Sequence, residues 1–200
     1  MLIKFLYLAF AYLCGAVPFA YIIAKFAGNV DIRTVGSGNP GATNVFRVVG
    51  KKSGAATFVL DVLKGFLPVY FAFYIDNSFS YSAAAAACVL AGHMYTVFLK
   101  FKGGKGVAAG LGAFLALFPL PAVIAFAVFI IALVLSGYVA LGSIIAALSL
   151  PIVTFYSGYP TEAVVFAFAA AVLIIYKHRT NIARLRAGTE NKFKIFKRRK

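Results

Sequence analysis

The sequence has few acidic side chains, only two cysteines and no tryptophan. Of its 200 residues 12% are charged and 62% hydrophobic, whereas soluble domains have about 25% charged and roughly 45–50% apolar residues. Five Asp and Glu stand against 20 Lys and Arg, which gives a formal net charge of +15. Cys14 and Cys88 lie in apolar runs without His or Asp at ligand spacing, so no metal site is predicted. This composition excludes a soluble domain and predicts an integral membrane protein.

Charge is absent over a long internal stretch. Between Gly106 and Thr161 there is no Asp, Glu, Lys, Arg or His, and because one span needs about 20 residues this stretch crosses a bilayer more than once. The apolar segments predict an all-α fold with seven transmembrane helices, at 2–24 (kinked at Pro18), 55–75, 79–99, 107–118, 122–135, 139–155 and 163–176. Merging 107–135 into one crossing gives five. We expect a single polytopic domain over residues 1–200, with 177–200 as a basic tail.

The positive charges fall into three segments, 27–53, 100–105 and the tail, which alone holds ten Lys and Arg. Cytoplasmic loops of membrane proteins carry an excess of Lys and Arg. The three segments are therefore predicted to be cytosolic and the N-terminus to lie outside; Lys4 is the one charge that argues the other way. Membrane topology accounts for the excess of Lys and Arg over Asp and Glu, so nucleic acid is not expected as a partner.

The first polar segment contains the run GSGNPGATN at 36–44, followed by Arg47. Gly and Pro at this density predict a loop rather than a helix, with backbone N–H groups exposed beside positive charge. Such a loop suits an oxyanion, most simply phosphate. A dinucleotide fingerprint would need a preceding strand, which the neighbouring spans exclude. The candidate residues are Gly36, Ser37, Gly38, Asn39, Thr43, Asn44 and Arg47.

A second loop reads Gly103-Gly104-Lys105-Gly106. It lacks the Ser or Thr that follows the lysine of a Walker motif, so ATP binding is not predicted. Glycine on both sides allows backbone N–H groups and the Lys105 ammonium to meet one phosphate, and a helix from 107 would present its N-terminus there. Lys100 and Lys102 are interpreted as topological anchors.

A third candidate group opens the tail. His178 and Asn181 are three residues apart and share a helical face, and Arg184 and Glu190 follow. Ser143, next to the helix break expected at Gly142, is a candidate for lining the cavity.

Three ionisable residues lie inside predicted spans. Asp61 and Lys64, at i and i+3, either pair with each other or face the site, because an isolated charge there costs roughly 2.5–3.5 kcal/mol on insertion scales. His93 is interpreted as an interior histidine with satisfied hydrogen bonds.

Hydrolase and metalloprotease patterns are missing: there is no G-x-S-x-G and no H-E-x-x-H. The acyltransferase pair of His and Asp with four residues between them is also absent, since Phe98 and Ala183 occupy those places after the two histidines. The candidate site thus lacks an evident nucleophile–base pair and is rich in cations, amide donors and glycines. It suits anionic substrates, one of them a lipid.

These three motif regions, in this order and chain length, resemble the bacterial acyl-phosphate:glycerol-3-phosphate acyltransferase family (PlsY type). The resemblance implies acyl transfer from acyl phosphate to the sn-1 hydroxyl of glycerol 3-phosphate, which yields lysophosphatidic acid and phosphate without metal or other cofactor. It places the enzyme in the bacterial cytoplasmic (inner) membrane among phospholipids, with its site on the cytosolic side. The implied catalytic residues are Ser37, Arg47, Lys105, His178 and Asn181; the implied substrate-binding residues are Gly36, Gly38, Asn39, Thr43, Asn44, Gly103, Gly104, Gly106, Ser143, Arg184 and Glu190.

Two alternatives stay open at this point. Broken helices and the charges at 61 and 64 would suit a small transporter or flippase for an anionic solute, although such folds often carry paired repeats and none is evident. A lipid-binding scaffold with a basic tail is the other. Acyl-chain preference, oligomeric state and the general base are not determined by the sequence.

Overall fold

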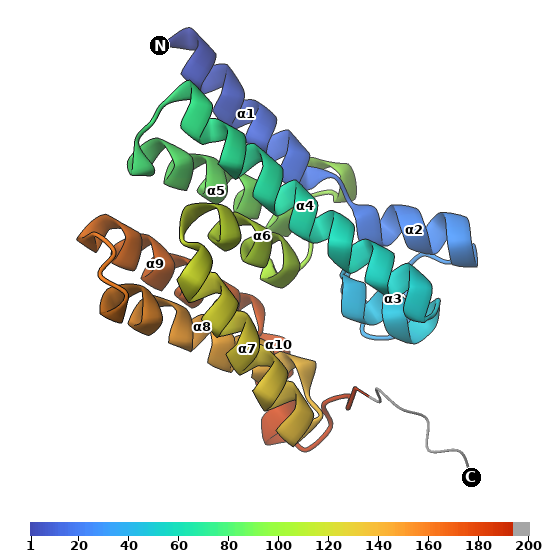
Figure 1. The fold of residues 1–200 in the computed structure, drawn as a ribbon. Helices are drawn as coiled ribbons and strands as arrows, with labels where there is room; N and C mark the ends of the chain where they lie inside the picture. The colour runs from blue at the N-terminus through green and yellow to red at the C-terminus, as the bar shows by residue number, and fades with distance from the viewer. Residues whose placement is uncertain (194–200) are drawn as a thin grey trace. The chain divides into compact units, whose positions relative to one another are not determined.

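The computed structural model describes residues 1–193, which contain helices and no strand, so the all-α prediction is confirmed (Figure 1). The last residues of the predicted tail lie outside the described part. The elements are α1 (Leu2–Ala16), α2 (Phe19–Gly28), α3 (Ala42–Val48), α4 (Lys51–Ile75), α5 (Phe79–Met94), the 3₁₀ turn η1 (Val97–Leu99), α6 (Val107–Leu117), α7 (Pro119–Ser136), α8 (Val139–Tyr156), α9 (Thr161–Lys177) and α10 (Arg179–Arg186).

Five segments of the described chain are long and apolar enough to cross a membrane: Leu2–Gly28, Lys51–Ile75, Phe79–Leu99, α7 and α8. Counting α9 with α10, which are bent by 58° to each other, gives six. The helix α6 is apolar but has only 11 residues. Helices occupy all seven predicted segments, while the number of spans and the orientation of the termini stay predictions.

The chain forms two compact units, Met1–Pro119 and Leu120–Lys200. In the first unit α1 and α2 follow one another along α4 and are separated by a break, where Pro18 lacks the N–H that would continue the helix. The predicted kink at Pro18 is thus a full interruption. It leaves the Ala16 carbonyl without the N–H of a continuing helix, and the Val17 carbonyl with only the Phe19 N–H at 3.1 Å from the local backbone, so further donors from other helices are favourable in an apolar interior.

The loop predicted at 36–44 is only partly a loop. The helix α3 begins at Ala42, so Thr43, Asn44 and Arg47 lie on a helix of seven residues. Gly41 is its N-cap in an extended conformation, and the residues after it contain neither Gly nor Pro until Gly50. The density of Gly and Pro ends at 41, which is why the expectation of loop structure was wrong for the second half of the motif.

Glycines set the close approach of the helices in the first unit. A Cβ on Gly15 would overlap the Val89 carbonyl, where α1 crosses α5, and a Cβ on Gly112 would overlap the Val62 carbonyl, where α6 crosses α4. Small residues at such crossings allow backbones to pack directly in a membrane.

Replacing Gly112 with alanine is therefore expected to destabilise the protein by about 1–3 kcal/mol, because the new methyl group meets a backbone atom that cannot rotate away. The matched change Gly110→Ala lies on the same helix, and its Cβ would approach nothing closer than the Phe114 ring at 3.3 Å. It should be neutral or slightly stabilising. Thermal unfolding in detergent distinguishes the two; equal melting temperatures would contradict the packing argument.

Lys4, the one charge that argues against the predicted membrane topology, has an acidic partner. Its ammonium pairs with Asp76 in the turn after α4 and lies 5.9 Å from the Tyr81 ring centroid, while the Tyr81 hydroxyl donates to the Lys4 carbonyl at 2.8 Å. The hydrogen bond from Lys4 lowers the pKa of the Asp76 carboxyl. The N-terminal end of α1 and the turn at 76 thus lie at one end of the unit, as the predicted topology requires.

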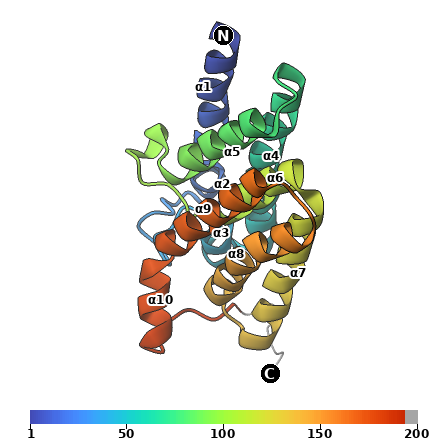
Figure 2. The ribbon, with the colours of Figure 1, turned by 90° about the vertical axis from the view of Figure 1, so that its left-hand side faces the viewer.

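In the second unit α8 and α9 run side by side and antiparallel, joined by a turn at Gly158 with φ +74° (Figure 2). The segment after α10 returns to the turn between α7 and α8: the Phe193 N–H donates to the Gly137 carbonyl at 2.7 Å, and the Lys192 ammonium lies 5.6 Å from the Tyr138 ring centroid. The start of the tail is therefore part of the folded unit.

Candidate functional site

The first motif is organised around the buried side chain of Asn44. Its Nδ2 donates to the carbonyls of Ile32 and Val35, both at 3.0 Å, and its Oδ1 accepts the Ser37 N–H at 2.9 Å. One amide thus holds three points of the loop. Gly36, at φ +63°, leaves no room for a Cβ, because that atom would overlap the Asn44 Oδ1. The loop conformation of the motif is therefore fixed by Asn44 from the first turn of α3.

Not every basic residue near this loop is available to an anion. Arg33 binds Asp31 through Nε at 2.9 Å and through Nη2 at 2.6 Å, and its guanidinium lies 5.0 Å from the Tyr21 ring centroid. Hydrogen bonds from Arg33 lower the pKa of Asp31 to about 2, so this carboxylate stays ionised at physiological pH. Arg33 is thereby neutralised, whereas Arg47, in the last turn of α3, is half-buried beside the motif.

The second motif lies on the C-terminal end of α5. The Gly103 N–H donates to the Met94 carbonyl at 3.2 Å, and the Gly104 N–H donates to the His93 carbonyl at 3.1 Å. A side chain at Gly103 would overlap that carbonyl, and one at Gly104 would overlap the His93 imidazole. The half-buried Lys105 thus extends from a backbone that α5 holds.

Gly106 completes this loop. It is the N-cap of α6 at φ +84°, and a Cβ there would overlap the Met94 side chain. The expected helix N-terminus directly after the loop is confirmed. Its glycines are required by close approach and by backbone conformation.

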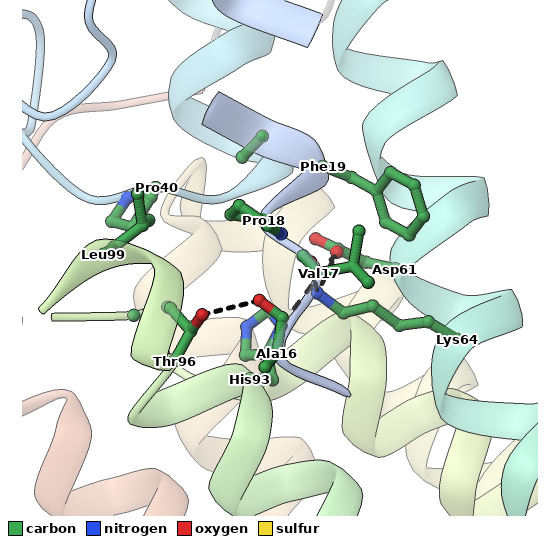
Figure 3. A pocket seen from close by; sticks show the side chains of 13 residues that line it. Ala16, Val17, Pro18, Phe19, Pro40, Asp61, Lys64, His93, Thr96 and Leu99 are labelled. Carbon is green, nitrogen blue, oxygen red and sulfur yellow. Dashed lines mark hydrogen bonds and ion pairs between the residues drawn. The ribbon is translucent and has the colours of Figure 1, made fainter. Parts of the chain in front are cut away.

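The first two motifs meet in one pocket of the first unit, which Figure 3 shows from close by. Pro40 of the first motif lines it together with Gly103 and Gly104 of the second. The cavity has a volume of about 10 Å³, which is about the space of one water molecule. It is therefore a small gap behind these loops and is too small to hold a lipid. Residues of the two glycine-rich loops therefore lie around one small cavity of the first unit.

Behind the loops the pocket is lined by charge. The Lys64 ammonium lies 2.8 Å from the Asp61 Oδ1 and donates to the Val17 carbonyl at 2.7 Å, and the Thr96 hydroxyl donates to the Ala16 carbonyl at 2.6 Å. These donors satisfy the carbonyls left at the break between α1 and α2, as the dashed lines in Figure 3 trace. The predicted pairing of Asp61 with Lys64 is confirmed; the part played by Thr96 was missed.

The third motif belongs to the second unit. His178 is the junction between α9 and α10, and its Nδ1 lies 2.8 Å from the Ile174 carbonyl. The Asn181 Nδ2 donates to Glu190 Oε1 at 2.9 Å, and Arg184 Nε donates to Glu190 Oε2 at 2.7 Å. Glu190 therefore ties the chain after α10 to the face of that helix.

Ser143 lies buried on α8, which runs through Gly142, so the helix break expected there was wrong. Its hydroxyl donates to the Val139 carbonyl of the preceding turn at 2.8 Å. Within residues 1–193 no three His, Cys, Asp or Glu side chains are placed to hold a metal ion together.

The family described as glycerol-3-phosphate acyltransferase matches residues 5–188. A glycerol-3-phosphate acyltransferase of Endomicrobium trichonymphae is 61% identical over 199 residues, which cover 100% of both chains. One from Geobacter metallireducens is 53% identical over 97% of this chain and 100% of its own.

Two solved structures are also similar. Both are crystal structures of PlsY, an integral membrane glycerol 3-phosphate acyltransferase. Its glycerol 3-phosphate form has a TM-score of 0.90 and 44% identity, and its lysophosphatidic acid form has 0.88 and 43%. Each comparison covers 95% of both chains.

Proposed function

This chain belongs to the glycerol-3-phosphate acyltransferase family and is a membrane enzyme of that activity, and we propose that its acyl donor is an acyl phosphate. The product would be lysophosphatidic acid, and the second product inorganic phosphate. The observation that carries the proposal is the meeting of the two glycine-rich motifs in the first unit, with Pro40 beside Gly103 and Gly104. A transporter or flippase has no support from these findings.

An acyl phosphate is a mixed anhydride and needs no covalent activation by the enzyme. The sn-1 hydroxyl oxygen of glycerol 3-phosphate attacks the acyl carbon, the bond from that carbon to the phosphate oxygen breaks, and the hydroxyl proton leaves with a phosphate oxygen. We propose the substrate's own phosphate as proton acceptor, because no carboxylate of the described motifs is poised for this. Glu190, the one acid among them, is engaged by Asn181 and Arg184.

The work of the protein is then to hold two anions together, and orientation of two bound reactants supplies ~7–11 kcal/mol. We propose that Ser37, Arg47 and Lys105 bind the acyl phosphate and the oxyanion that develops on its carbonyl. The N–H groups of Asn39 and Gly104 assist. The walls of this site are formed by Thr43, Asn44 and the remaining glycines of the two motifs, which are Gly36, Gly38, Gly103 and Gly106.

We assign the orientation of glycerol 3-phosphate to His178 and Asn181, with a contribution from Ser143. Arg184 and Glu190 would act by fixing the Asn181 amide, to which Glu190 is directly bonded. A location in the bacterial inner membrane with the site on the cytosolic side is proposed from the basic charge of the loops that carry the motifs.

The donor is tested with purified protein in detergent, palmitoyl phosphate and radiolabelled glycerol 3-phosphate. We expect lysophosphatidate and phosphate in equal amounts. Palmitoyl-CoA in place of palmitoyl phosphate should give no product, and glycerol in place of glycerol 3-phosphate should release no phosphate above the hydrolysis background. Product from palmitoyl-CoA alone would contradict the proposed donor while leaving the acyltransferase activity intact.

A further inference from the structure

A buried ionic cluster lies beside the proposed site and takes no part in the proposed reaction. The exposed fractions of Asp61, Lys64 and His93 are 2%, 9% and 7%. The His93 Nδ1 lies 4.0 Å from the Asp61 Oδ1, and the Lys64 ammonium lies 5.6 Å from the Phe19 ring centroid. All three side chains line the same pocket as Pro40, Gly103 and Gly104.

Stability alone is a weak reason for such a pair. Replacing a buried ion pair by apolar residues of similar volume is often neutral or stabilising, whereas removal of one partner is strongly destabilising. The contacts indicate a different reason. Lys64 reaches across to the break after α1 and donates to the Val17 carbonyl. An apolar side chain at 64 would leave this carbonyl with the Phe19 N–H at 3.1 Å but would remove the link from α4.

The cluster connects two segments of the proposed site. Through Lys64 it holds the break between α1 and α2, and through His93 it contacts the second motif. The His93 carbonyl accepts the Gly104 N–H, and the His93 ring occupies the space where a side chain of Gly104 would lie. The next residue along the chain is Lys105. A shift of His93 therefore moves the backbone that carries the lysine assigned to the phosphate.

We propose that Asp61, Lys64 and His93 are positioning residues for acyl transfer: the ion pair sets the place of His93, and His93 sets the place of the Gly103–Gly104 backbone and hence of Lys105. This rests on the proposed function, because it deepens the role given there to Lys105. None of the three contacts a reacting atom. Their loss is expected to lower kcat and to leave KM for either substrate little changed.

The test compares an apolar replacement of the pair with an equivalent change elsewhere in the same unit. The variant Asp61→Leu/Lys64→Met leaves no unpaired charge. Its control is Lys4→Met/Asp76→Leu, which replaces the more exposed ion pair at the C-terminal end of α4. His93→Gln is the second variant, because it removes the imidazole that lies against Gly104 and keeps a polar side chain at this position. Melting temperature, kcat and both KM values are measured with palmitoyl phosphate and glycerol 3-phosphate.

For the pair replacement we expect kcat to fall about 30- to 100-fold, in the range of the loss that a ~1 Å misplacement causes. For this variant both KM values should stay within about threefold of the wild type, and its melting temperature should stay near that of the wild type. The kcat of His93→Gln should fall about tenfold, and that of the Lys4→Met/Asp76→Leu control about twofold at most. Wild-type kcat in His93→Gln, or in a folded pair replacement, would overturn the proposal. If the pair replacement does not fold, His93→Gln decides. An inactive wild type would instead refute the proposed donor.

Discussion

Replacing Lys105 with alanine is expected to lower phosphate release by a factor of about 10²–10³, with the fold retained. Loss of one donor aimed at a developing oxyanion typically has this effect on kcat. The loop should keep its shape, because the hydrogen bonds from Gly103 and Gly104 to α5 are made by the backbone and do not involve the lysine side chain. The measurement is phosphate release from palmitoyl phosphate in the presence of glycerol 3-phosphate.

The matched control is Lys102→Ala, in the same loop and exposed. It removes the same charge at a position interpreted as a topological anchor, and its activity should remain within about twofold of the wild type, as is usual for exposed charges. Equal losses in the two variants would mean that the general positive charge of the loop matters and not one directed ammonium. Near-normal turnover of Lys105→Ala would remove this residue from the proposed site.

Much of the helical framework follows from apolar run length alone. The segments predicted at 55–75 and 139–155 are helices within a few residues of those bounds, because charge and Gly–Pro turns border them. The features that the sequence indicated are local: a departure from the helix at Pro18, predicted as a kink and observed as an interruption, and a helix N-terminus directly after Gly106.

What the sequence did not predict depends on contacts between distant residues. Thr96 is one polar residue in an apolar segment, and only the structure shows that it caps the Ala16 carbonyl 80 residues earlier. The break at Pro18 was the available signal, since it implies carbonyls in need of donors. Lys64 seemed equally suited to the substrate and to Asp61, and its bond to Val17 decides for a structural partner.

Asn44 illustrates the same limit inside a motif. Residue type and spacing mark it as polar and near the proposed phosphate loop, but its side chain bonds to the loop itself. Its neighbour Ser37 is held there through its backbone N–H. Residue type and spacing therefore did not predict what these two residues of the motif contact.

The second large effect is expected for Asn44→Asp, a change of almost no volume. A carboxylate cannot donate, so the carbonyls of Ile32 and Val35 lose their partners, and each unsatisfied group costs about 1–3 kcal/mol. The bond from the Ser37 N–H is kept, so one end of the loop stays attached while the other is released. A negative charge also lies at the base of a loop proposed to bind phosphate. We expect kcat/KM to fall more than about 100-fold.

The control is Asn29→Asp, an exposed position at φ +48° that Asp tolerates, and it should leave kcat/KM unchanged. The pH dependence separates loop geometry from general charge. Burial among carbonyls favours the neutral acid, and once protonated the introduced carboxyl donates one hydrogen bond and carries no charge. Relative to the wild type, activity of Asn44→Asp should therefore rise as pH is lowered. If the kcat/KM of Asn44→Asp divided by that of the wild type is near one at every pH, the Asn44 amide does not hold the loop in the conformation that catalysis requires.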